Sequence, residues 1–171
     1  MKKRTIVVLA LLLALVSLSA AQDSSAMIYA PAAKSKFANL PVLPDCLTVA
    51  VQRGDPEKGP SVLLLKFKAG CIVPWHWHTA GEGLMVVSGN GQVRMKDGQP
   101  MSMRSGDYLY LPGKGIHQFT ALSAVTLFDS PDGPFDIHYV DSSGKEIPLS
   151  DALKRIVKVK PAGAPTTSVP Q

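Results

Sequence analysis

The sequence predicts an all-β fold, a sandwich or jelly roll of about ten short strands with one late helix. Short runs of β-branched and apolar residues alternate with Gly, Pro, Asn and Asp turn signals. The expected strands are 47–52, 62–68, 72–78, 84–87, 92–96, 100–103, 108–111, 116–122, 125–129 and 135–140. Only residues 148–159 depart from this pattern, with apolar residues at helical spacing and Ser150 as the expected N-cap.

The N-terminus is typical of a secretory signal peptide over residues 1–21. Lys2, Lys3 and Arg4 precede an apolar run at 6–16, and small residues follow up to Ala21. The apolar run is shorter than the ~20 residues that a membrane-spanning helix needs, which favours cleavage over an uncleaved anchor. We therefore expect Sec-type export, a periplasmic or secreted protein, and no membrane association after cleavage.

Composition divides the remaining chain into three parts. Residues 22–40 read as an N-terminal linker, 41–160 as one folded domain and 161–171 as a disordered, Pro/Thr/Ala-rich tail. Loss of the three basic residues at the N-terminus lowers the net charge from +5 to +2. No basic cluster dense enough to neutralise a row of phosphates remains, so we expect no nucleic-acid binding.

The two cysteines, Cys46 and Cys71, have two interpretations. In an oxidising compartment they could form a disulfide that closes a loop of 25 residues. A cysteine beside a glycine in an apolar strand is also often a small buried hydrophobic residue. Both possibilities stay open at this point.

Two histidines and a glutamate crowd into residues 76–82. Residues two apart in a strand point to one face, so His76 and His78 project together while the flanking tryptophans turn away. Glu82 lies between two glycines, which allow the chain to turn back and bring the carboxylate to the same place. His117 is the candidate for a third imidazole because it heads an apolar strand after a Gly-rich turn.

Imidazole nitrogens and a carboxylate suit a transition metal such as Zn, Cu, Mn or Fe. Three imidazoles and one carboxylate fill about four positions, and an octahedral ion keeps two neighbouring positions for water, substrate or dioxygen. A lone histidine on an apolar strand is more often an ordinary core or surface residue. We give that interpretation to His138, and the metal interpretation to the clustered histidines.

The same spacings resemble those of the cupin family. Its first motif is a Gly, five residues, His-x-His, three or four residues, Glu, six residues and Gly. The sequence matches it in full with Gly70, His76, His78, Glu82 and Gly89. The resemblance covers about residues 62–129, and it implies a double-stranded β-helix, the jelly-roll cupin barrel, for the domain at 41–160.

The second motif of the family is a Gly, five residues, Pro-x-Gly, two residues, His, three residues and Asn. Gly106, Pro112 and His117 match it, whereas Lys114 stands at the inner Gly position and Ala121 at the Asn position. A glycine lies on each side of Lys114, and we expect those glycines to supply the turn. By resemblance, one divalent metal is held by His76, His78, Glu82 and His117, and the protein forms a homodimer.

The resemblance implies a range of functions, because one fold hosts many chemistries. We expect an exported, metal-dependent oxidoreductase of the dioxygenase type that acts on a small molecule, with Glu82 as ligand or proton acceptor. The alternative is a non-catalytic, metal-dependent small-molecule binding or stress-related module. That alternative gains support because no second Glu or His is evidently placed to face the same cavity.

Overall fold

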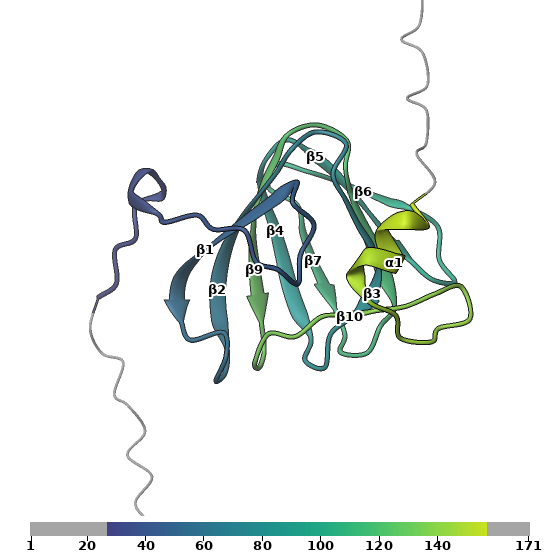
Figure 1. Ribbon diagram of the computed structural model, residues 1–171. Helices are drawn as coiled ribbons and strands as arrows, with labels where there is room; N and C mark the ends of the chain where they lie inside the picture. Colours follow the sequence, from purple (N-terminus) through teal and green to yellow (C-terminus); the bar gives the residue numbers. More distant parts are fainter. Residues whose placement is uncertain (1–26, 157–171) are drawn as a thin grey trace, which may run out of the picture.

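The computed structural model describes residues 27–156, and Figure 1 shows their arrangement. The predicted signal peptide (1–21) and tail (161–171) lie outside these residues. The described elements are a 3-10 helix η1 (Ala32–Lys34), ten strands and helix α1 (Leu149–Lys154). The strands are β1 (Leu47–Gly54), β2 (Ser61–Phe67), β3 (Ile72–Trp77), β4 (Glu82–Ser88), β5 (Asn90–Met95), β6 (Met101–Arg104), β7 (Tyr108–Leu111), β8 (His117–Ala121), β9 (Val125–Pro131) and β10 (His138–Tyr139).

The ten strands form two five-stranded sheets. Strand order is β1-β2-β9-β4-β7 in the first sheet and β10-β3-β8-β5-β6 in the second. All of these pairings are antiparallel, and strands distant in the sequence are neighbours, such as β2 with β9 and β3 with β8. This arrangement is a jelly roll, and the predicted all-β class is confirmed.

The core lies between the two sheets. Alternation puts every second side chain inside, and in β9 buried and half-buried residues alternate without a break. Phe67 of β2 and Phe119 of β8 join the sheets, with ring centroids 4.8 Å apart. Around them pack aliphatic side chains that include Leu47, Leu63, Val73, Leu84, Val86, Val93 and Leu127. Each such side chain contributes roughly 1.5–3 kcal/mol of hydrophobic stabilisation.

The last predicted strand is shorter than expected. Residues 135–140 were expected to be extended, but β10 covers only His138–Tyr139. The preceding backbone has other partners: Phe135 donates its N–H to the loop between β1 and β2, and the carbonyl of Asp136 accepts a hydrogen bond from the His78 ring. These contacts are distant in sequence, so the alternation of side chains does not reveal them.

Helix α1 confirms that the chain turns helical near residue 148, but the expected N-cap is wrong. Ser150 lies inside the first turn, and the capping position is Pro148, which makes no side-chain hydrogen bond. Proline suits the start of a helix because its φ is already near the helical value and it has no N–H to satisfy. Residues 157–159 of the predicted helix lie outside the described chain. Within residues 27–156, no helix is long and apolar enough to span a membrane.

Cys46 and Cys71 form a disulfide, which settles the question that the sequence left open. The bond ties the segment before β1 to the residue before β3. Backbone hydrogen bonds support both ends, since Lys68 donates to the Cys46 carbonyl and Ala121 donates to the Cys71 carbonyl. Cys71 is 2% exposed, so the bond is part of the core.

The end of the predicted linker contacts the barrel. Ala38 pairs with Val49 of β1 in an isolated bridge, and Leu40 packs against the core. The ring of Phe37 lies under Lys66 Nζ, 4.1 Å from the ring centroid. Residues 37–40 therefore extend the folded part of the chain toward its N-terminus.

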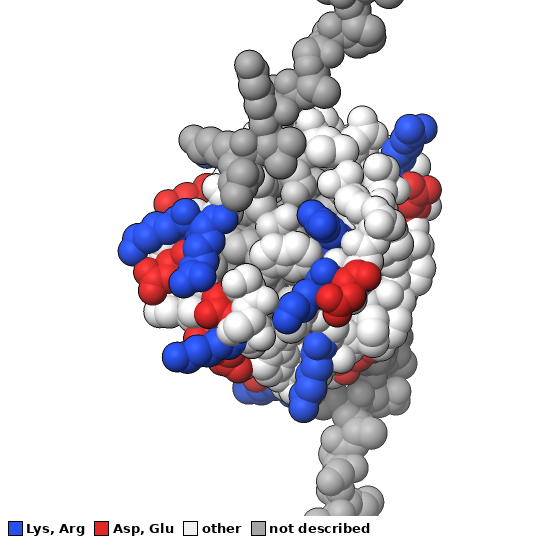
Figure 2. Space-filling model, turned by 90° about the vertical axis from the view of Figure 1, so that its right-hand side faces the viewer, with Lys and Arg blue, Asp and Glu red and all other residues white. Residues whose placement is uncertain are grey.

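Positive and negative side chains lie close together on the molecular surface. On the face drawn in Figure 2, Lys and Arg side chains lie beside Asp and Glu. Ion pairs join Lys154 to Asp151 at 2.9 Å and Lys58 to Asp55 at 2.6 Å. The described part of this face is therefore mixed in charge and does not form the continuous basic track that binds a phosphate backbone.

Gly91 provides a test of core packing. A Cβ at this position of β5 would lie 2.6 Å from Cζ of Phe119, and the densely packed ring has little room to move. We expect Gly91→Ala to lower the free energy of unfolding by about 1–3 kcal/mol, measured by urea denaturation. Gly59→Ala is the matched control, because a Cβ there meets nothing within 4 Å. Equal effects of the two changes would contradict this packing.

Candidate metal centre

Three histidines converge inside the barrel. His76 lies in β3, His78 follows directly after it and His117 begins β8. They are 4%, 8% and 3% exposed, and one nitrogen of each lies within 4.8 Å of the others. Strands β3 and β8 are neighbours, with His76 directly opposite His117. The sheet thus brings the third imidazole to the first two across 39 residues of sequence.

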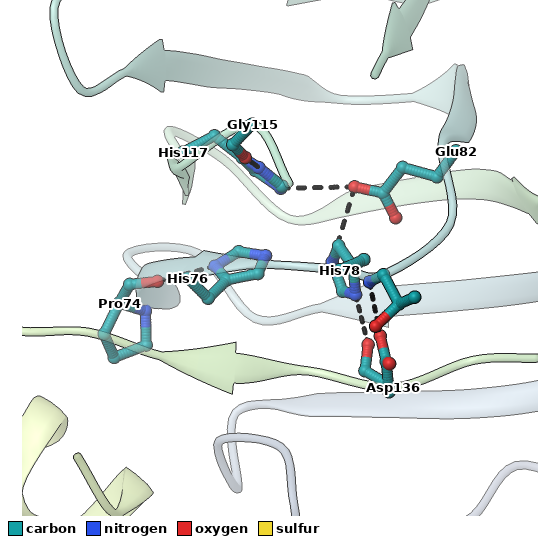
Figure 3. A network of polar contacts seen from close by, with 8 residues as sticks. Pro74, His76, His78, Glu82, Gly115, His117 and Asp136 are labelled. Atoms are coloured by element: carbon teal, nitrogen blue, oxygen red, sulfur yellow. Dashed lines mark hydrogen bonds and ion pairs between the residues drawn. The ribbon is translucent and has the colours of Figure 1, made fainter. Parts of the chain in front are cut away.

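Glu82 reaches the same point from the other sheet. It is the first residue of β4 and is 5% exposed. Its Oε1 lies 3.2 Å from Nε2 of His117 and 3.5 Å from Nε2 of His78 (Figure 3). Glu82 therefore contacts two of the three histidines, whereas the group within metal-binding distance in residues 27–156 comprises His76, His78 and His117.

Backbone carbonyls fix the orientation of all three rings. Nδ1 of His76 contacts the Pro74 carbonyl at 2.6 Å, and Nδ1 of His117 contacts the Gly115 carbonyl at 2.8 Å. Nδ1 of His78 contacts the Asp136 carbonyl (Figure 3). Because a carbonyl only accepts hydrogen bonds, each Nδ1 must carry a hydrogen, and in the neutral ring Nε2 then keeps its lone pair. This pattern is typical of metal-binding histidines.

Charge in the site favours a cation. Burial, followed by the charges of His117 and His78, lowers the pKa of His76 well below its ordinary value, so this ring is neutral. Burial raises the pKa of Glu82, but its interactions with His117 and His78 outweigh that effect, and its pKa is lowered overall. Imidazole lone pairs and a carboxylate facing one another repel unless a proton or metal ion lies between them. These donors fit a divalent transition metal.

The site opens onto a small apolar cavity of about 50 Å³. Apart from the four site residues and Asp129, its lining is made of aliphatic and phenylalanine side chains, among them Leu47, Leu63, Leu84, Phe119, Leu127 and Phe135. One water needs roughly 10–15 Å³ of such volume, so the cavity holds only a few waters or one small molecule. Its apolar wall strengthens electrostatic interactions at the site.

Comparison with known proteins identifies the family. Residues 63–130 match the family model described as a cupin domain. A solved RmlC-like cupin from Ralstonia eutropha superposes on 73% of this chain and 81% of its own, with a TM-score of 0.56 and 20% sequence identity. The described domain is a cupin.

The cupin also resembles a solved polyketide cyclase in fold and a plant protein in sequence. The polyketide cyclase RemF from Streptomyces resistomycificus aligns with 68% of this chain and 87% of its own at a TM-score of 0.57 and 14% identity. In sequence, the cupin is 32% identical over 79 residues to the DNA damage-repair/toleration protein DRT102 of Arabidopsis thaliana. That match covers 46% of this chain and only about a quarter, 26%, of the plant protein. At these levels of identity the solved structures show the fold alone.

The turn before His117 corrects one expectation about the second cupin motif. Lys114 itself adopts a left-handed conformation with φ 63°, so the turn does not rely on the flanking glycines for a positive φ. Backbone hydrogen bonds hold it, because Lys114 donates to the His78 carbonyl and Gly115 donates to Pro112. Gly113 is needed for close approach, since a Cβ there would lie 2.6 Å from the carbonyl oxygen of Thr79.

The structure also reveals a cavity residue that the sequence interpretation missed. Asp129 of β9 is 2% exposed, lines the same cavity as Glu82 and is its diagonal neighbour across β4 and β9. Burial, then the charge of Glu82 and a hydrogen bond to it, raises the pKa of Asp129 well above its ordinary value. Its signal in the sequence is its position: it follows Val125 and Leu127 at the alternation that points side chains inward.

His138 lies outside the centre. Its ring stacks on Trp77 with centroids 3.9 Å apart, and it contacts Glu146 at 3.2 Å and Asp136 at 3.3 Å. These partners anchor β10 beside β3. The only group of three or more His, Cys, Asp or Glu side chains within metal-binding distance in residues 27–156 is the one formed by the other three histidines.

The lowered pKa of His76 predicts a pH effect on the metal-free protein. In the unfolded chain His76 takes up a proton below about pH 6.5, while burial keeps the folded ring neutral. Because the unfolded state then binds more protons, the His76 contribution to stability falls as the pH drops below 6.5. Urea unfolding of wild type and His76→Gln between pH 7.5 and 5.5 measures this contribution of His76 to the free energy of unfolding. Wild type should lose stability relative to the variant as pH falls, and a constant or growing wild-type advantage would contradict the prediction.

Proposed function

We propose that this cupin is a metal-dependent oxidoreductase of the dioxygenase type that acts on a small oxygenated molecule. The observation that carries the proposal is the donor set at the wall of an apolar cavity. Carbonyl groups engage Nδ1 of all three imidazoles, and Nε2 of His78 and of His117 faces Glu82. In this proposal His76, His78, Glu82 and His117 hold one divalent ion. Zn, Cu, Mn and Fe are all compatible with these ligands.

A bound ion would supply Lewis acidity and, for Fe, Mn or Cu, one-electron chemistry with dioxygen. The protein residues supply the rest. The three histidines are held rigid by their carbonyl partners, so the site needs little reorganisation. In this proposal Glu82 acts as a ligand or accepts a proton from a molecule bound beside it. The apolar lining excludes water from the reacting molecule.

Cavity size narrows the substrate class. At about 50 Å³ the cavity is well below the ~150 Å³ that holds a benzene molecule in an engineered protein cavity. This comparison favours dioxygen and a substrate with few heavy atoms over an aromatic ring.

Oxygen uptake tests the proposal. The protein would be stripped of metal, reloaded separately with Fe(II), Mn(II), Cu(II) and Zn(II), and mixed with a panel of small hydroxy, keto and thiol compounds at an oxygen electrode. We expect uptake with at least one redox-active metal and none with Zn(II). Absence of uptake throughout, together with recovery of an unchanged small molecule from denatured protein, would favour the non-catalytic binding module instead.

We also propose that the protein is exported to the periplasm or secreted. The disulfide between Cys46 and Cys71 supports an oxidising compartment, because such bonds are rare in the cytosol. Fractionation of cells that express the full chain, with N-terminal sequencing of the mature protein, checks this. We expect a start at Gln22, and an intact N-terminus in the cytosolic fraction would contradict export.

A homodimer through the outer face of β4 and β7 is the assembly we propose. Met85, Val87, Tyr108 and Tyr110 are each 48–63% exposed there, and adjacent exposed apolar side chains mark interaction surfaces. We expect a dimer mass for wild type by light scattering and a monomer for the double variant Met85→Lys/Tyr108→Lys. Leu122→Lys, at another exposed apolar position, is the control. A monomeric wild type would contradict the assembly.

A further inference from the structure

The three carbonyl groups that hold the imidazoles come from different parts of the chain. His76 and His117 each contact the carbonyl of the residue two positions earlier, so their own segments fix them. His78 lies one residue past the end of β3, and its Nδ1 contacts the carbonyl of Asp136, 58 residues away (Figure 3). The orientation of the His78 ring therefore depends on where a distant residue is placed.

Asp136 lies in the irregular segment 132–137 between β9 and β10. Earlier in this segment, Asp132 donates its N–H to the Gly81 carbonyl, and Phe135 donates to the loop between β1 and β2. Both of these bonds precede Asp136. Because no strand ladder places Asp136, its carbonyl depends on other contacts of the same residue.

The side chain of Asp136 makes such a contact. Its Oδ1 accepts a hydrogen bond from the N–H of Thr79 at 2.8 Å. Thr79 directly follows His78, so Asp136 binds two consecutive residues, one through its carbonyl and the other through its carboxylate. Two bonds between the same two segments fix their orientation as well as their distance, and a bond to a carboxylate is of the stronger kind.

The second carboxylate oxygen has a different partner. Oδ2 of Asp136 lies 3.3 Å from Nε2 of His138, and the two side chains are 37% and 29% exposed. An ion pair open to solvent contributes little because water screens it. His138 is also only two residues further along the same segment, so this contact does not join Asp136 to the backbone beside His78. The bond to Thr79 does.

We propose that Asp136 is a positioning residue of the metal centre, whose carboxylate binds the Thr79 N–H and thereby keeps its own carbonyl on Nδ1 of His78. This contact directs Nε2 of His78 toward Glu82, 3.5 Å away. Asp136 acts through His78, as an outer partner that orients a ligand. The inference rests on the proposed metal centre.

Three variants separate the side-chain bond from other effects. Asp136→Ala removes the acceptor and leaves the backbone carbonyl, whereas Asp136→Asn keeps an Oδ1 that can accept from Thr79. Asp141→Ala is the matched control, because Asp141 accepts backbone N–H groups in the turn after β10, to which no residue of the centre belongs.

Co²⁺ binding is the first measurement, because the visible absorption of Co²⁺ reports ligand geometry. We expect Asp136→Ala to weaken Co²⁺ affinity about 10-fold, the low end for an outer partner since the carbonyl itself remains, and to change the spectrum. Asp136→Asn and Asp141→Ala should stay within about threefold of wild type and keep its spectrum.

Nuclear magnetic resonance of the metal-free, ¹⁵N-labelled protein is the second measurement. A buried imidazole N–H bound to a carbonyl exchanges slowly with water and gives a signal, which His78→Gln assigns by its disappearance. We expect Asp136→Ala to lose the His78 Nδ1–H signal through exchange, and Asp136→Asn and Asp141→Ala to retain it.

The outcomes distinguish this inference from the proposed function. Wild-type affinity, spectrum and His78 signal in Asp136→Ala would overturn the positioning role, and so would equal losses in the Ala and Asn variants. If wild type binds no Co²⁺, the metal centre fails, while the His78 signal still shows whether Asp136 orients the ring. Should Asp136→Ala lose its folded far-UV circular dichroism, Asp136→Leu replaces it, since it also lacks an acceptor but keeps a side chain of greater bulk.

Discussion

His78→Ala is expected to purify with less than about a tenth of the metal content of wild type. The substitution removes one of three imidazoles and leaves Glu82 with a single histidine contact, at His117. Loss of a hydrogen bond in the outer shell of a metal site costs about 10- to 100-fold in affinity, so loss of a ligand should cost more than that. Elemental analysis of protein purified in parallel, followed by titration with Zn²⁺, measures the effect.

The chain offers a matched control for this experiment. His138→Ala removes another histidine that lies in a strand, β10, paired with β3. This histidine is not part of the metal centre. It should keep the full wild-type metal content. If His78→Ala also keeps it, the ligand assignment is wrong, and the histidine cluster is a feature of the core.

Removal of the disulfide is expected to lower the free energy of unfolding by about 3 kcal/mol. The chain-entropy model assigns about this much stabilisation to a cross-link that closes a loop of this length in the unfolded chain. The double variant Cys46→Ala/Cys71→Ala tests this, because it frees the 25-residue segment that holds β1 and β2. The unfolded state gains most of the freedom, so urea unfolding should shift its midpoint to lower concentration.

Wild type treated with a reducing agent is the internal comparison. It should unfold at nearly the same urea concentration as the double variant, because both lack the cross-link. A change of less than about 0.5 kcal/mol in both would mean that the bond adds nothing to stability, and a loss in the variant alone would point to packing at Cys71, which is 2% exposed.

Several features of the site follow from local sequence. The strand parity that sends His76 and His78 to one face needs only the two-residue period of an extended chain. The turn signals set the number and approximate limits of the strands, and nine of the ten predicted segments correspond closely to strands in residues 27–156. The exception is the last, where contacts of Phe135 and Asp136 replace strand pairing.

Other features have no local signal. The Asp136 carbonyl that holds His78 is 58 residues away from it in the chain. The conformation of the turn at Lys114 also could not be read from local sequence. We expected the flanking glycines to adopt the left-handed conformation, but Lys114 adopts it. The choice between a disulfide and two buried thiols also depended on how closely the two segments lie in the folded barrel.

The sequence by itself determined the all-β class, the pair of inward histidines and, through its motif spacing, which four residues to expect at the centre. Only the tertiary structure decided that Asp129 lies next to Glu82 in the cavity lining, that carbonyls fix all three imidazoles and that the cavity is small. The physical reason is the strand order. A jelly roll pairs strands that are distant in sequence, such as β4 with β9, so side chains meet according to a register that no local pattern encodes.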